Sequence, residues 1–90
     1  MTNICVRAFV TGKVQGVWFR QSTKEQALKQ GVTGWAKNLS DGRVEVLLCG
    51  EKTAVANVQQ WLHEGPELAR VDDVVADELG YQSVENFVTA

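Results

Sequence analysis

Helix and strand signals along this 90-residue chain predict one α+β domain, residues 1–90, with the order β-α-β-β-α-β and a short C-terminal strand. Short apolar, β-branched runs are separated by two segments with helical spacing. A glycine follows each of these two segments, as is typical of a helix C-terminus. An Asp-Gly pair, the strongest hairpin signal in the chain, separates the second and third expected strands.

The first part of the chain predicts a strand, a loop and a helix. Residues 4–10 are mainly apolar and predict a strand that ends at Thr11-Gly12. A loop follows, and a helix is expected over residues 19–30, ended by Gly31. The apolar stripe of this helix is thin and consists of Phe19, Thr23 and Ala27.

The middle of the chain predicts a hairpin and then a second helix. Strands are expected over residues 32–39 and 43–49, on either side of the Asp-Gly turn. Thr53 is a suitable N-cap for a helix that runs to about residue 64 and ends at Gly65-Pro66. The buried face of this helix is expected to carry Val55, Val58 and Leu62.

Two further strands, over residues 71–78 and 84–88, complete the predicted order. This order is that of the ferredoxin-like sandwich, a mainly antiparallel sheet with both helices on one face. Right-handed crossovers place the third strand between the first and the second, antiparallel to both. The loop over residues 12–20 should therefore face residues 37–41 at one end of the sheet.

Composition excludes several classes of protein. With 44% apolar residues and a net charge of −2, the chain is typical of a globular domain. It has no run of about 18 apolar residues that would span a bilayer, so we expect no membrane partner. One histidine and two separated cysteines do not form the usual four-ligand zinc site, and we expect neither metal nor cofactor. The N-terminal residues lack a secretory signal, which predicts a cytoplasmic protein.

The charge is divided unevenly between the two halves of the chain. Residues 1–43 contain seven basic and two acidic residues, a net charge of +5. Residues 44–90 contain two basic and nine acidic residues, a net charge of −7. A basic half in an acidic protein is typical of a site that binds a small anion and repels large polyanions. The alternative is that these charges only decorate solvated faces.

The loop between the first strand and the first helix is the most informative stretch. Its sequence is Gly12-Lys13-Val14-Gln15-Gly16-Val17-Trp18-Phe19-Arg20. Unpaired backbone N–H groups and the helix dipole favour a small anion at a helix N-terminus, and Gly16 allows close approach. Arg20 lies in the first turn, where a cation is disfavoured unless an anion is also present. The pattern indicates a phosphate or carboxylate site, and the alternative is a tight turn with a solvated arginine.

A second motif ends the second strand. It consists of Gly34-Trp35-Ala36-Lys37-Asn38, followed by Gly42-Arg43-Val44 and then Gly50. Asn38 would lie beside the expected anion loop, where an amide can hold a water molecule through both its donor and its acceptor. The alternative is an ordinary asparagine that enters a hairpin turn.

Together the two motifs, at the expected separation within residues 4–88, resemble the acylphosphatase family. The resemblance implies an enzyme that hydrolyses acyl phosphates to a carboxylate and inorganic phosphate. It further implies that water attacks phosphorus without a metal or a covalent intermediate. The implied partner is a small-molecule acyl phosphate, and we expect a monomer.

The resemblance also implies a role for each matched position. Arg20 and Asn38 would be catalytic, Arg20 by binding the phosphoryl group and Asn38 by orienting the attacking water. The phosphate-binding residues would be Gln15, Gly16, Val17, Trp18, Phe19 and Arg20, the first five through their backbone N–H groups. The ring of Trp18 could border the entrance for the acyl group or only cover the start of the helix. The tail, residues 87–90, lacks the terminal basic or aromatic residue of many relatives, so its role stays open.

Two other functions occur on folds of this order. A non-catalytic binding or regulatory module is the main alternative, because a fold alone does not fix a function. RNA binding would require a characteristic basic-glycine-aromatic run and exposed aromatic side chains on the sheet. The sequence predicts neither, and we expect no nucleic-acid partner.

Cys5 and Cys49 are predicted on the helix-free face of neighbouring strands, at the end of the sheet far from Arg20. Antiparallel pairing permits a disulfide if their Cα atoms lie within about 7 Å. A cytoplasmic chain would instead keep both cysteines reduced. Both states stay open, and a disulfide here would stabilise the fold rather than take part in the site.

Overall fold

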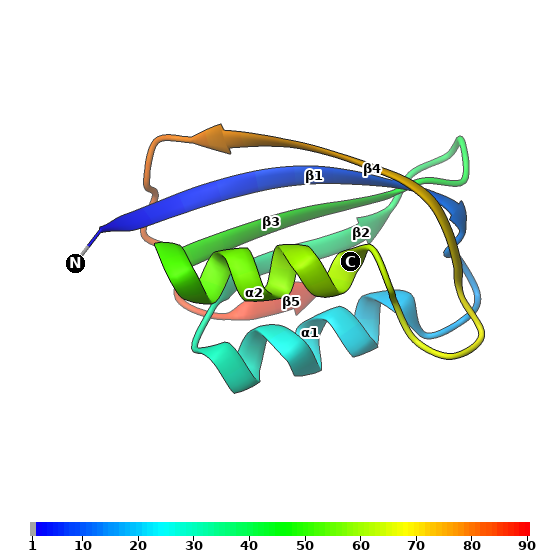
Figure 1. The fold of residues 1–90 in the computed structure, drawn as a ribbon, viewed down its shortest axis with the longest axis horizontal. Coiled ribbons are helices and arrows are strands. Elements are labelled where there is room, and N and C mark those ends of the chain that lie inside the picture. The colour runs from blue at the N-terminus through cyan, green and yellow to red at the C-terminus, as the bar shows by residue number, and fades with distance from the viewer. Residues whose placement is uncertain (1) are drawn as a thin grey trace.

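The computed structural model describes residues 2–90 and confirms the α+β, ferredoxin-like fold (Figure 1). Its elements are β1 (Asn3–Lys13), α1 (Phe19–Gln30), β2 (Thr33–Asn38), β3 (Val44–Glu51), α2 (Lys52–Leu62), β4 (Arg70–Leu79) and β5 (Phe87–Thr89). The strands form one sheet in the order β4-β1-β3-β2-β5, and both helices cover the same face of it. Within residues 2–90, no helix has the length and apolar character needed to cross a membrane.

The topology brings the ends of β1 and β2 together, as predicted. Strand β3 lies between β1 and β2 and is antiparallel to both. Val10 near the end of β1 and Asn38 at the end of β2 both pair with Val44 of β3. The loop that follows β1 and the turn that follows β2 therefore leave the same end of the sheet.

The core lies between the two helices and the sheet. Phe19, Thr23 and Ala27 of α1 are buried, which confirms the predicted apolar stripe. Val55, Val58 and Leu62 of α2 are buried as well, again as predicted. Phe19 at the first position of α1 is buried, and the centre of its ring lies 5.7 Å from that of Trp61 on α2, so the start of this helix packs against α2.

Several predicted boundaries are wrong by a few residues. The N-cap of α2 is Glu51 rather than Thr53, because the Glu51 carboxylate accepts a hydrogen bond of 3.1 Å from the Ala54 N–H. Strand β1 extends to Lys13, because it continues to pair with β4 beyond an irregularity at Thr11/Gly12.

Only glycine fits at position 12, where a Cβ atom would lie 2.1 Å from the Arg70 carbonyl oxygen.

The helix-free face carries the two cysteines, and they form a disulfide. Cys5 and Cys49 are directly paired across β1 and β3, with their Cα atoms 4.1 Å apart. Their side chains form a small buried cluster with Leu47, and the partly buried Val84 packs on it. The Gln82 N–H donates to the Cys5 sulfur at 3.3 Å. The segment between β4 and β5 therefore covers the disulfide.

Two aromatic rings, Phe9 and Trp35, also lie on the helix-free face and are half-buried. The guanidinium of Arg43 lies 4.8 Å from the centre of the Phe9 ring, and the Lys37 ammonium lies 5.0 Å from that of Trp35. Because cations of the chain already contact these rings, they serve as packing groups. Trp35 is therefore a partly buried packing residue.

Candidate functional site

The loop over residues 14–18 is anchored in the core by two apolar side chains. Val14 is 1% exposed and Val17 is 6% exposed, so both side chains belong to the core. Gln15 is half-buried, whereas Gly16 and Trp18 are exposed. Burial explains the two valines of the motif, because they anchor the loop in the core while Gly16 and Trp18 stay exposed.

The backbone of this loop alternates in handedness. Gly16 has a φ of 75° and Trp18 a φ of 68°, both left-handed, while Val17 between them does not have a positive φ. Such alternation directs successive N–H groups to one side and forms a concavity suited to an anion. Trp18 is the N-cap of α1, and a bulky residue in this conformation costs about 1 kcal/mol. The strain is concentrated at the point where the loop meets the helix.

The start of α1 is electropositive. Arg20 is the second residue of the helix, and the first turn contains no acidic residue. The positive end of the helix dipole and the Arg20 guanidinium therefore reinforce each other. A planar guanidinium can bind two oxygens of one anion, and this is the arrangement that the motif predicts.

The C-terminal tail, whose role the sequence left open, contacts Arg20. The Arg20 Nη1 group donates a hydrogen bond to the main-chain oxygen of Ala90. The Ala90 N–H in turn donates to the Ala36 carbonyl at 2.8 Å, next to the parallel pairing of β5 with β2. The main chain of the tail thus contacts the guanidinium directly.

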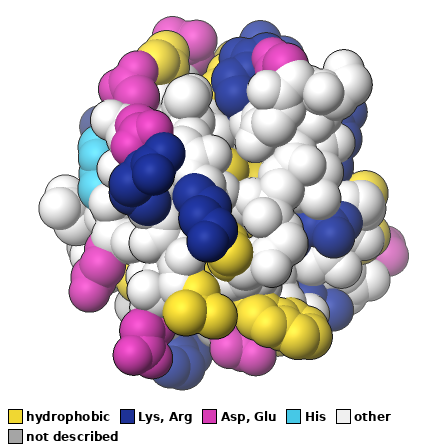
Figure 2. Space-filling model, turned by 90° about the vertical axis from the view of Figure 1, so that its right-hand side faces the viewer, with side chains coloured by type: hydrophobic (Ala, Val, Ile, Leu, Met, Phe, Trp, Pro, Cys, Tyr) yellow, Lys and Arg dark blue, Asp and Glu magenta, His cyan; other side chains and the backbone are white. Residues whose placement is uncertain are grey.

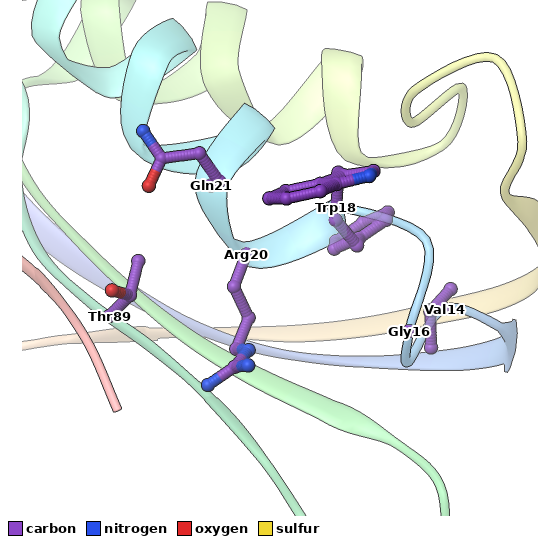
Figure 3. A pocket seen from close by; sticks show the side chains of 7 residues that line it. Val14, Gly16, Trp18, Arg20, Gln21 and Thr89 are labelled. Atoms are coloured by element: carbon purple, nitrogen blue, oxygen red, sulfur yellow. The ribbon is translucent and has the colours of Figure 1, made fainter.

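A cavity of about 390 Å³ opens beside this arginine (Figure 3). Its lining residues are Val14, Gly16, Trp18, Phe19, Arg20, Gln21 and Thr89. Figure 3 shows that the side chains of Arg20 and Trp18 leave the start of α1 in different directions. Gly16, on the loop, and Thr89 lie on opposite sides of Arg20 in this view. A pocket of this size is within the range that binds small molecules.

The side chain of Gln15 fastens the loop to the hairpin between β2 and β3. Its Nε2 group donates to the Leu39 carbonyl at 2.7 Å and to the Arg43 carbonyl at 3.0 Å. Leu39 follows Asn38 directly in the chain. The two motifs that the sequence predicted to face each other are therefore joined by these two hydrogen bonds.

A second interaction stiffens the same hairpin. The Asp41 carboxylate accepts a hydrogen bond of 3.1 Å from the Arg43 N–H and one of 2.8 Å from Arg43 Nε. These contacts, the backbone hydrogen bond first, hold the pKa of Asp41 below its usual value. The carboxylate consequently stays ionised and keeps the turn closed.

Asn38 is the last residue of β2 and is exposed. It does not belong to the residues that line the cavity, but its neighbour Leu39 is held by Gln15 on the loop. Its side chain is accessible to water at the end of β2. The catalytic roles of Arg20 and Asn38 and the phosphate-binding role of the loop stay predictions.

Sequence reasoning missed one side-chain role and three further residues. The role of Gln15 was assigned to its backbone N–H, and nothing in the motif indicated that its side chain bridges to the hairpin. Gln21 and Thr89 line the cavity, and Ala90 contacts Arg20 from 70 residues away. No local pattern signals such a contact, because it depends on the parallel pairing of β5 with β2.

The end of the molecule that bears the loop is also where charge and apolar groups meet (Figure 2). Figure 2 shows Lys and Arg side chains spread over this face, Asp and Glu side chains mostly around its rim, and apolar side chains exposed at its lower edge. Trp18 and Leu68, which are 75% and 69% exposed, both belong to loops at this end (Figure 1). The surface therefore combines charged side chains of both signs with exposed apolar groups at one edge.

Comparison with known proteins identifies the family. The model of the family described as acylphosphatase matches residues 6–89. A curated acylphosphatase from Nitrosococcus oceani is 52% identical over 83 residues, which are 92% of this chain and 93% of the relative. The solved acylphosphatase from Coxiella burnetii has a TM-score of 0.94 at 40% identity, covering 98% of this chain and 93% of that one. The solved acylphosphatase from Bacillus subtilis has a TM-score of 0.93 at 32% identity, with 97% and 98% covered. This chain therefore belongs to the acylphosphatase family.

Proposed function

We propose that this protein hydrolyses acyl phosphates to a carboxylate and inorganic phosphate by direct attack of water on phosphorus, with neither a metal nor a covalent intermediate. Because the chain belongs to the acylphosphatase family, it is an enzyme that acts on acyl phosphates. The observation that carries the mechanism is the concave loop beside Arg20 at the start of α1. The loop with alternating backbone handedness, the N-terminus of α1 and the Arg20 guanidinium all adjoin the same cavity.

In this proposal the loop and Arg20 hold the phosphoryl group. The N–H groups of residues 15–19 and the Arg20 guanidinium share the charge that spreads over the phosphoryl oxygens in the transition state. Asn38 binds the attacking water through its amide and places it in line with the bond that breaks. The hairpin that carries Asn38 is held against the loop by Gln15, which fixes the distance between water and phosphate.

The bonds that form and break require no strong base from the protein. A bond forms between the water oxygen and phosphorus, and the bond between phosphorus and the acyl oxygen breaks. The carboxylate leaves with the bonding electron pair, and it is a good leaving group without protonation. The proton of the water passes to an oxygen of the bound phosphoryl group, so that the products are the carboxylate and phosphate.

Phosphate release from a simple acyl phosphate by the wild-type protein tests the proposed function. We expect turnover that is unchanged by a chelator, and inhibition by inorganic phosphate that is competitive with the substrate. Binding of phosphate without turnover would instead support a non-catalytic binding module and would overturn the proposal. Loss of turnover on chelation would overturn its metal-free part. The cytoplasmic location and the monomeric state stay predictions.

A further inference from the structure

The side chain of Trp18 does not pack in the core of the fold. The ring is 75% exposed, the largest exposed fraction among the bulky apolar residues of the described chain. It lies outside the buried core cluster, to which its neighbours Val17 and Phe19 belong. Although Trp18 is the N-cap of α1, its side chain makes no capping hydrogen bond within the described structure. Of the two interpretations that the sequence left open, coverage of the helix start is therefore the weaker.

The backbone at this position does not favour tryptophan either. With a φ of 68° and a ψ of 16°, the residue is in the left-handed region that suits glycine or asparagine. The turn therefore gives no reason for a bulky ring. A residue held in a strained conformation with an exposed apolar side chain is typical of a contact made outside the fold.

The cavity supplies the place where such a contact occurs. Trp18 and Arg20 line the same cavity and leave the helix start in different directions (Figure 3). Among the seven described residues that line it, Arg20 alone is charged, and the polar groups Gln21 and Thr89 are neutral. The cavity thus has a cationic end and an apolar wall. An acyl phosphate has the complementary form, an anionic phosphoryl end joined to an acyl group.

We infer that Trp18 is a specificity-determining residue whose ring contacts the acyl group, so that the site prefers acyl phosphates with a flat aromatic acyl group over those with a small aliphatic one. The inference rests on the proposed function and extends it to the acyl end of the substrate. A flat apolar group gains contact area against the indole ring, whereas a methyl group gains little. The absence of a second cation in the lining disfavours an acyl group that carries its own carboxylate.

The test compares benzoyl phosphate with acetyl phosphate. The measured quantity is the ratio of the two kcat/KM values, because a general loss of activity cancels in this ratio. Trp18→Asn removes the ring and keeps a residue that tolerates the left-handed backbone. Trp18→Phe keeps an aromatic ring. Leu28→Asn is the matched control, because Leu28 is also an apolar residue, 60% exposed, and lies on α1 away from the cavity.

We expect the wild type to favour benzoyl phosphate and Trp18→Asn to lower the ratio about 10-fold. Trp18→Phe is expected to retain most of the preference, and Leu28→Asn all of it. An equal loss on both substrates in Trp18→Asn would overturn the inference and leave the proposed function intact. If Trp18→Asn does not fold, equal inhibition of the wild type by phenylphosphonate and methylphosphonate would overturn it. A wild type that hydrolyses neither substrate would overturn the proposed function itself.

Discussion

Replacing Arg20 by alanine is expected to lower kcat/KM for an acyl phosphate about 1000-fold. The guanidinium supplies the only charged group in the lining of the cavity, within the described residues. The substitution also removes the hydrogen bond that Arg20 donates to the main-chain oxygen of Ala90. It leaves the backbone N–H groups of the loop in place. The measurement is steady-state phosphate release. Arg20→Lys should restore little of the lost rate, because an ammonium cannot bind two oxygens as a planar guanidinium does.

Asn38→Ala should separate the two catalytic roles. Because Asn38 positions water rather than phosphate, we expect kcat to fall at least about 100-fold while KM and inhibition by phosphate change little. Retained turnover in this variant would contradict the water-positioning role.

Two control variants remove the same chemical groups elsewhere. Arg7→Ala removes an exposed guanidinium from the helix-free face, where it lies over the Phe9 ring. Asn57→Ala removes an exposed amide from α2, where it donates to Gln30. Both should keep wild-type kinetics. A loss in Arg7→Ala comparable to that in Arg20→Ala would mean that net charge, rather than the position of Arg20, controls activity.

Reduction of the Cys5–Cys49 disulfide is expected to lower the free energy of unfolding by about 2–4 kcal/mol. The bond joins residues 44 apart in sequence, so it removes a large loop from the unfolded chain. For a domain of this size the midpoint of thermal unfolding should fall by more than about 10 °C. Urea unfolding with and without a dithiol reductant measures the effect.

A double variant isolates the covalent bond from the side chains. Cys5→Ala combined with Cys49→Ala should be destabilised to at least the same extent and should no longer respond to the reductant. Turnover of the folded fraction should be close to that of the wild type, because the bond lies at the far end of the sheet from the anion loop. A midpoint that is independent of reductant in the wild type would contradict this account.

The sequence predicted the fold and the neighbourhood of the site because both depend on local signals. Gly31 ends α1 where a C-terminal glycine is expected, with a φ of 70°. The Asp41-Gly42 turn fixed the register of β2 and β3, and this register carries Asn38 to the end of the sheet at which the loop begins. Right-handed crossovers then determined which strand ends meet.

The remaining features depend on contacts between distant parts of the chain. Thr53 satisfied the usual preference for an N-cap, yet α2 begins at Lys52 and is capped by Glu51, whose carboxylate accepts from the Ala54 N–H. The contact of Ala90 with Arg20 follows from the pairing of a three-residue strand, which has too little sequence to predict its position. The side chain of Gln15 donates its two hydrogen bonds to backbone carbonyl groups. Every residue has such a carbonyl, so no pattern of side chains in the sequence identifies the acceptors.

Hydrolysis in water enriched with heavy oxygen tests the central claim most directly. The wild-type protein converts an acyl phosphate in the presence of a chelator, and mass spectrometry determines which product contains the label. Attack of water on phosphorus predicts one heavy oxygen in the inorganic phosphate and none in the carboxylate after a single turnover. Label in the carboxylate would mean that water attacks the carbonyl carbon, and it would contradict a site built to hold the phosphoryl group beside a water on Asn38.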